Sequence, residues 1–241
     1  MSLANILRLF GPTLFGLGAL RRRAVREALV EVFVAGLRRA ALAVVIISAL
    51  LGLILFRHVL PLIPIFGGDP AQLAAIFLFT VQHLGDILAG VLVVGQSGLL
   101  CTWELVQARD RRQFAAAVAT GIDPVLCFVL PRIWGVALLF AFVQMVFKAL
   151  TVLSGVYFVR WLDGRFFGPE LGEVLARNGG EILAGYAVNL ALGVVLAVIC
   201  AAPALEPARR DALREPPIAR VFLQCLTLVF VAKLLQVALL L

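Results

Sequence analysis

The sequence is poor in charge and in the residues that usually carry enzyme chemistry. Only 15% of its 241 residues are charged, and it has two histidines and four cysteines. About a quarter of the residues of an ordinary soluble domain are charged, so this class is excluded. The sequence contains no CxxC pair, no HExxH motif and no P-loop, which argues against a metal centre, a disulfide framework or a nucleotide site. We predict that the chain is not an enzyme, with no catalytic residue, no metal and no cofactor of its own.

The sequence also lacks the short polar and apolar alternation of membrane β-strands. Instead, 63% of its residues are hydrophobic, the mean hydropathy is +1.06, and several apolar runs reach the ~20 residues that a membrane-spanning helix needs. The net charge of +7 comes mostly from arginines at the ends of these runs, which favours a topological role over nucleic-acid binding. We predict an all-α integral membrane protein with one domain, residues 1–241.

Five membrane spans and one interfacial helix are predicted. Between about residues 21 and 39, apolar residues recur at helical spacing with arginines off that face, as in amphipathic helices that lie in the membrane interface. The third apolar run is too long for one straight crossing, so part of it must lie outside the bilayer. An apolar patch at 9–20 precedes an arginine triplet, the reverse of a signal peptide, so no cleaved signal is expected. The predicted spans are about 40–56, 71–100, 124–159, 182–202 and 218–241.

The arginines predict the orientation of these spans. Fourteen arginines fall in the segments on the side of the N-terminus and four on the opposite side. Cytoplasmic segments carry the excess of positive charge. We therefore predict a cytoplasmic N-terminus and a C-terminus on the outer side.

Strongly polar side chains occur inside the predicted spans. Gln82, His83 and Asp86 share one face of the second span, and they fit either a hydrogen-bonded patch between helices or a substrate or proton pathway. Arg132 lies near the cytoplasmic start of its span, from which it can snorkel to the interface. Lys148 and Lys233 are expected in the outer half, where snorkelling and contact with an external partner are both open.

The tetrapeptide Gly95-Gln96-Ser97-Gly98 offers small surfaces for close helix packing. It also resembles the GxSG motif of rhomboid proteases, in which a serine nucleophile needs a histidine base from another span. Both histidines of this chain precede Ser97, and His83 is 14 residues away on the same helix, about 21 Å along it. We therefore set the protease aside and assign Gly95, Ser97 and Gly98 to helix packing.

A helix stop and a helix start lie next to each other before the third span. Residues 104–120 contain no Gly or Pro and predict one helix, which Gly121 is placed to end. Asp123 is a good N-cap and Pro124 a good first residue for the next helix. This elbow fits either a solvated connector or a lever moved by a separate motor.

Several short motifs lie between residues 84 and 134. Through them the sequence resembles the MlaE/YrbE family, the permeases of ABC transport systems that work with MCE proteins in lipid trafficking. The resemblance rests on a block of about 50 residues that keeps the order and spacing of the family's short motifs, together with the plan of five spans. These motifs are Leu84-Gly85, Gly95-x-x-Gly98, Thr102-x-Glu104, Gln113, Ile122-Asp123-Pro124 and Pro131-Arg132-Ile133-Trp134.

The resemblance implies a bacterial inner-membrane permease that moves phospholipid or another hydrophobic lipid. It implies four kinds of protein partner: a second permease copy, a cytosolic ABC ATPase that binds ATP, a periplasmic MCE-domain assembly and often a STAS-type subunit. The lipid pathway would include Gln82, His83 and Asp86. The ATPase would couple to this chain through Glu104, Arg112, Gln113, Gly121, Asp123 and Pro124.

The sequence departs from the family pattern at several of these positions. Gln82-His83-Leu84-Gly85-Asp86 replaces Arg-Glu-Leu-Gly-Pro, Gln96 replaces an arginine, and Arg112 replaces a glutamate at the expected ATPase contact. A heterodimer with a more typical permease and a homodimer with a matched ATPase both remain open. The alternative from another class is a secondary transporter with His83 and Asp86 as a proton relay.

Overall fold

The computed structural model describes residues 9, 11, 13, 18, 22–59, 70–163, 172, 176, 179–205 and 217–240, and these residues are helical apart from short turns. The predicted loops at 57–70, 160–181 and 205–217 lie largely outside the described residues. The longer helices are α2 (Arg23–Val59), α3 (Pro70–Val93), α4 (Leu99–Asp110), α5 (Gln113–Ala119), α6 (Leu130–Asp163), α8 (Gly179–Ala201) and α9 (Pro217–Leu240). Two π-helical segments, Val94–Gly98 and Val125–Val129, and the 3₁₀ turn Ala202–Leu205 join them.

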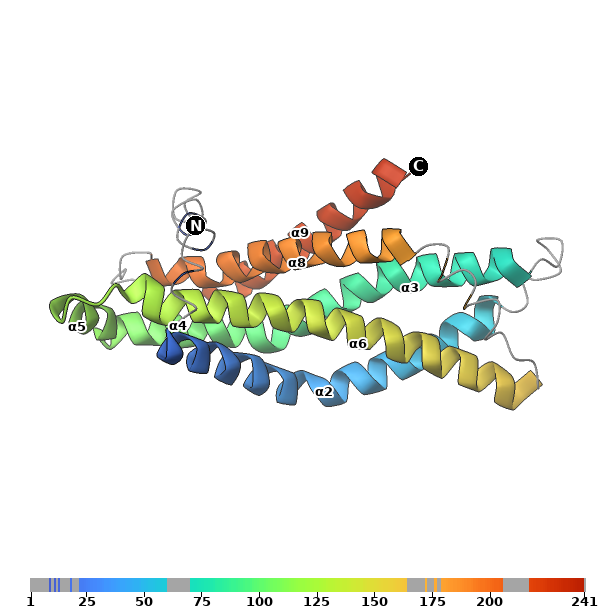
Figure 1. The fold of residues 1–241 in the computed structure, drawn as a ribbon, viewed down its shortest axis with the longest axis horizontal. Coiled ribbons are helices and arrows are strands. Elements are labelled where there is room, and N and C mark those ends of the chain that lie inside the picture. The colour runs from blue at the N-terminus through green and yellow to red at the C-terminus, as the bar shows by residue number, and fades with distance from the viewer. Residues whose placement is uncertain are drawn as a thin grey trace.

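Five helical stretches are long and apolar enough to cross a membrane, as the sequence predicted. They are Arg23–His58, Ile76–Asp110, Val125–Phe158, Leu183–Leu205 and Ile218–Gln236. They form an elongated bundle, in which the start of α2, the helices α4 and α5 and the end of α8 gather at the same end (Figure 1). We call this the α5 end. The last residues of α2 and α6 lie toward the opposite end, together with the start of α3.

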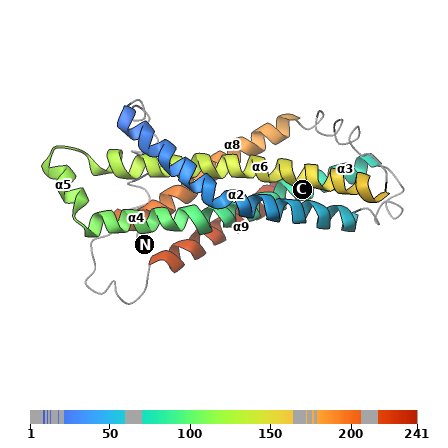
Figure 2. The ribbon, with the colours of Figure 1, turned by 90° about the horizontal axis from the view of Figure 1, so that it is seen from below.

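The predicted interfacial helix and first span form one unbroken helix. We expected a boundary near residue 39, but α2 runs for 37 residues, about 55 Å at 1.5 Å per residue. It changes direction partway along without ending (Figure 2). Continuity has a simple cause, because no proline occurs between Arg23 and Val59 to remove a backbone donor. The helix is longer than the ~30 Å hydrocarbon core of a bilayer, so part of it must lie outside that core.

Helix α6 forms the centre of the bundle and packs on α2, α3 and α8. Its Leu139, Phe140 and Phe147 are almost fully buried. Near the opposite end from α5, α2 and α6 approach so closely that a Cβ on Gly52 would meet the Thr151 carbonyl, and a Cβ on Gly155 would meet the Phe56 ring. The missing side chains therefore allow this close packing of the two helices.

The segment that was predicted as one helix over residues 104–120 is broken in two. Helix α4 ends at Asp110, and α5 begins at Gln113 after a turn in which Arg112 has the left-handed φ of 57°. The prediction of one helix was therefore wrong. The sequence did not reveal the turn, because no Gly or Pro marks it. Tertiary packing overrides local propensity here: the turn brings Phe114 back to Phe128 of the following segment, with ring centroids 5.7 Å apart.

The predicted elbow after α5 is confirmed in its local structure. Gly121 has a φ of 75°, its N–H donates to the Val118 carbonyl at 3.0 Å, and the Ile122 N–H donates to the Ala117 carbonyl at 2.9 Å. This pair of bonds is the Schellman motif, which needs a residue with positive φ and favours glycine there. The Asp123 carboxylate then accepts the Val125 N–H at 2.8 Å, so Asp123 is the N-cap of the next helix and Pro124 its first residue.

Candidate functional site

A buried cluster of charged side chains lies inside the bundle, centred on Asp86 of α3. The Asp86 side chain is 1% exposed, and its two oxygens lie 2.6 Å from the ammonium groups of Lys148 on α6 and Lys233 on α9. The sequence left snorkelling or an external partner open for the two lysines. Neither alternative included the contact that the structure shows, because each lysine pairs with Asp86 inside the bundle.

Two amide side chains complete the cluster. Asn189 of α8 donates to Asp86 at 2.9 Å and accepts a hydrogen bond from Lys233 at 2.7 Å. Gln236 accepts another from Lys233 at 2.8 Å. Polar contacts therefore tie together α3, α6, α8 and α9. An ionised group in hydrocarbon is costly, and pairing across helices offsets part of this cost.

The two lysines differ in how many ammonium hydrogens remain free to bind a ligand. An ammonium group has three donor hydrogens, and Lys233 uses them on Asp86, Asn189 and Gln236. Lys148 pairs with Asp86 and otherwise faces the ring of Tyr186, 5.0 Å from its centroid. Within the described part of the chain, Lys148 thus has spare donor capacity. The cluster also has two ammonium groups for one carboxylate, so it carries an excess of positive charge.

Lys148 opens onto a groove of about 400 Å³ between α3, α6 and α8. Apart from Lys148, Gln82 and Tyr186, the groove is lined by aliphatic side chains and a methionine. Met145 and Leu153 at its side are more than half exposed. The groove therefore combines an apolar wall with one cationic group. Its lining residues are Leu78, Val81, Gln82, Met145, Lys148, Ala149, Val152, Leu153 and Tyr186.

The three residues that were predicted to share one face of the second span do not form one polar cluster. They are Gln82, His83 and Asp86. Gln82 lines the groove and Asp86 anchors the cluster, whereas the buried His83 ring lies against Phe79 at 4.4 Å. The His83 Nδ1 atom has no hydrogen-bond partner among the described residues. Both Asp86 oxygens are already engaged by lysines, and no hydrogen bond joins Asp86 to His83 in the described part of the structure. This arrangement gives the proton-relay alternative no support.

The three residues that were predicted to serve helix packing, Gly95, Ser97 and Gly98, lie in different settings. A Cβ on Gly98 would lie 2.9 Å from the Cys200 sulfur of α8, and the adjacent Thr102 hydroxyl donates to the Cys200 carbonyl at 2.7 Å. Gly95 is less tightly packed, since a Cβ there would lie 3.8 Å from Phe222. The Ser97 hydroxyl lies against α2, and it lines a polar pocket rather than a protease site.

The residues predicted for ATPase coupling lie at the α5 end in two different settings. Glu104 points back into the bundle and pairs with Arg132 at 3.5 Å, and the Arg132 guanidinium also donates to the Phe128 carbonyl at 3.0 Å. Arg132 is therefore paired within the bundle, a contact that the snorkelling prediction did not include. By contrast, Arg112 and Gln113 are exposed on the turn between α4 and α5. The nearby Val118 and Ile122 are 62% and 46% exposed, respectively.

Sequence reasoning missed the contributions of α8 to the site. Tyr186 and Asn189 are the polar residues of the otherwise apolar stretch 182–202. Polar side chains in a span usually face other helices, and this signal was present in the sequence. What it lacked was the partner, because Asn189 and Asp86 are separated by 103 positions.

Comparison with known proteins supports the prediction of a membrane permease. A family model described as Permease MlaE matches residues 29–238. No curated protein matches the chain.

Proposed function

The chain belongs to the MlaE permease family, and we propose that, as the membrane subunit of an ABC lipid transporter, it moves phospholipid through the groove beside Lys148. The observation that carries this proposal is the combination of an apolar groove with a cation that has spare donor capacity. Acyl chains suit the aliphatic wall. A lipid phosphate suits Lys148, because the cluster has one ammonium group more than its single carboxylate balances. The favoured cargo is thus an anionic phospholipid.

Energy for transport would come from a separate ATPase that docks on the α4–α5 turn. This turn projects from the end of the bundle (Figure 1), and it presents arginines beside the exposed Val118 and Ile122. Apolar side chains exposed together with charge on a projecting helix are typical of a protein contact. The elbow at Gly121, Asp123 and Pro124 connects α5 to α6, whose Lys148 faces the groove. A movement of α5 would therefore be transmitted to the helix that carries the proposed lipid contact.

The family and the distribution of charge support the remaining parts of the proposal. The α5 end carries most of the described arginines, so we place it and the N-terminus in the cytoplasm and the C-terminus in the periplasm. The chain would lie in a bacterial inner membrane. It would work with a second permease copy, a periplasmic MCE protein that exchanges lipid with the groove, and a STAS-type subunit.

Lipid binding to the purified complex tests the groove. Lys148→Gln removes the cation and should lower the retained anionic phospholipid about tenfold, the effect of one charged hydrogen bond. The matched control is Met145→Gln, which places the same amide in the groove without removing charge. Mass spectrometry of lipids retained after detergent purification gives the readout. Equal anionic lipid in the two variants would overturn the assignment of the groove.

A further inference from the structure

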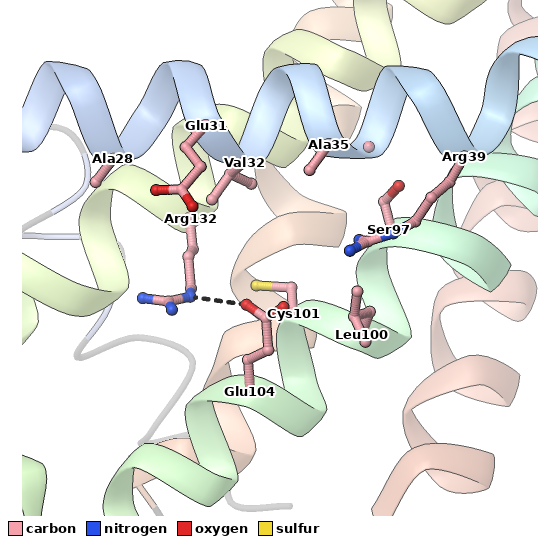
Figure 3. Close-up of a pocket in the computed structure, with 11 residues that line it drawn as sticks. Ala28, Glu31, Val32, Ala35, Arg39, Ser97, Leu100, Cys101, Glu104 and Arg132 are labelled. Carbon is pink, nitrogen blue, oxygen red and sulfur yellow. Dashed lines mark hydrogen bonds and ion pairs between the residues drawn. The ribbon is translucent and has the colours of Figure 1, made fainter.

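A second cavity, separate from the groove, lies at the α5 end. It has a volume of about 190 Å³ and is enclosed by α2, by the segment from Ser97 to Glu104, and by Arg132 of α6 (Figure 3). This volume equals about six waters at the ~30 Å³ that one water occupies in the liquid. We call it the α2 pocket. Its charged lining residues are Glu31, Arg39, Glu104 and Arg132.

The charges of the α2 pocket are balanced but poorly paired with each other. The Arg132–Glu104 contact is 3.5 Å, longer than the 2.7–2.9 Å of a strong charge-assisted hydrogen bond. Glu31 and Arg39 form no ion pair with the described residues, and in Figure 3 both extend from α2 toward the opposite wall. Two acids and two bases therefore line one cavity; Glu31 and Arg39 are exposed residues of α2, and neither has a charged partner among the described residues.

A buried hydroxyl gives an independent sign of a missing partner. Ser97 is 6% exposed and lines the α2 pocket, yet its Oγ has no hydrogen-bond partner within the described structure. Every other described serine and threonine donates its hydroxyl to a backbone carbonyl. A buried hydroxyl without a partner costs about 1–3 kcal/mol. Ser97 is thus the exception, and it is the one that faces a charged cavity.

We propose that the α2 pocket binds the phosphate and ammonium groups of an ethanolamine phospholipid headgroup. Because Glu104 and Arg132 already pair with each other, an anion alone would leave Glu31 without a charged partner and a cation alone would leave Arg39 without one, whereas a zwitterion pairs with both. The phosphate pairs with Arg39 and accepts from the Ser97 hydroxyl, because guanidinium groups bind phosphate bidentately. The ammonium group pairs with Glu31 and the free oxygen of Glu104.

The order of residues along α2 matches the order of groups in a membrane lipid. From the middle of the helix toward its start come the exposed apolar side chains Leu50, Ile46 and Leu42, then Arg39, then Glu31. A phospholipid has the same sequence of acyl chain, phosphate and ammonium. Positions 39, 42, 46 and 50 fall on one helical face, so the acyl chains of a lipid held by Arg39 can lie along α2. This favours a lipid over a free headgroup as the source of the ligand.

Two matched pairs of variants test the α2 pocket in the purified full-length chain. Arg39→Gln is compared with Arg38→Gln, and Glu31→Gln with Glu27→Gln; the control residues are exposed on α2 and do not line the pocket. Each protein is incubated with an equimolar mixture of ethanolamine, choline and glycerol phospholipids, and bound lipid is identified by native mass spectrometry. We expect at least a tenfold loss of the ethanolamine lipid in the pocket variants alone.

A second arm replaces the lipid with water-soluble glycerophosphoethanolamine. Competition by this compound would show that the headgroup suffices, whereas binding of the lipid alone would show that the acyl chains on α2 are needed; both results support the pocket. Equal ethanolamine lipid in the Arg39 and Arg38 variants, or no preference over choline and glycerol lipids, would overturn it. The inference does not rest on transport through the groove, because Lys148→Gln should leave this lipid bound.

Discussion

The Asp86 cluster and the α2 pocket hold charged groups in opposite ways. In the cluster, both ion pairs measure 2.6 Å, and the Asp86 side chain is 1% exposed. At the α2 pocket, the single ion pair measures 3.5 Å, with side chains 23% and 42% exposed. The first site pairs its carboxylate with residues from its own helices, and Lys148 of the cluster also opens onto the groove. The second leaves charge and a buried hydroxyl facing a cavity.

Depth along the bundle accounts for this difference. Inside the bundle a charged side chain loses its water, so it stays only where another part of the chain pairs with it. At the α5 end, lipid headgroups and water compete for the same groups, so tight internal pairing is not required. Charges in the middle therefore hold helices together, with Lys148 also facing the groove, and charges at the end remain open to ligands and partners.

Replacing Asp86 should have the largest effect on stability. Asp86→Asn keeps the shape of the side chain but leaves two buried ammonium groups without their counter-ion, and we expect a loss of about 3–5 kcal/mol in the free energy of unfolding. Unfolding in detergent, followed by circular dichroism, measures it. The control is Asp110→Asn, because the Asp110 side chain is 53% exposed in its pair with Arg109 and should contribute less than about 1 kcal/mol. Equal losses would remove the contrast between the cluster and the bundle end.

Lys233 and Lys148 should contribute differently to the free energy of unfolding. Lys233→Met leaves the Asn189 and Gln236 oxygens without their donor, and we expect a cost of about 1–3 kcal/mol. Lys148→Met leaves the Asp86 Oδ1 atom without its ion pair, but Lys233 and Asn189 still hold the other oxygen and no described amide is orphaned, so its cost in the same unfolding measurement should be smaller. A larger loss for Lys148 would mean that it is the structural lysine and would weaken the groove as a lipid site.

The sequence predicted the parts of the fold that depend on local chemistry. Five apolar runs gave the spans, and the residue types at Gly121, Asp123 and Pro124 gave the helix stop and start that the structure contains. These features depend on residues a few positions apart. The turn at Arg112 was missed because no Gly or Pro marks it; beyond the turn Phe114 packs near Phe128, a contact that local propensity does not report.

The candidate site was only half predictable for a related reason. The intramembrane Asp86 and the two lysines were visible as functional candidates, but their pairing joins positions 86, 148 and 233. Apolar periodicity fixes which residues lie in a span, and it does not fix the rotation of one span against another. Polar partners in different spans can therefore be proposed from sequence, while their matching requires the packed bundle.

The elbow at the α5 end should tolerate substitution less well than its exposure suggests. Gly121 has open space around its Cα but a φ of 75°, so Gly121→Ala should cost about 1 kcal/mol through backbone strain alone. Gly95→Ala is the control, because this helical glycine has room for a Cβ, 3.8 Å from Phe222. The ratio of lipid transport to ATP hydrolysis in the reconstituted complex measures coupling. A ratio that stays unchanged in Gly121→Ala would argue against the elbow as a lever.

Arg112 should have the smallest effect on stability and a specific effect on assembly. It is exposed and outside the ion pairs of the bundle, so Arg112→Glu should change the free energy of unfolding by less than about 0.5 kcal/mol. If its charge meets the ATPase, the same substitution should lower co-purification of the ATPase, and Arg112→Lys should retain it. Because Arg112 has a left-handed backbone, Arg112→Asn separates conformation from charge: asparagine accepts this conformation but carries no charge. Retention of the ATPase by Arg112→Glu would place the contact elsewhere on the α5 end, and the exposed Val118 would be the next residue to replace.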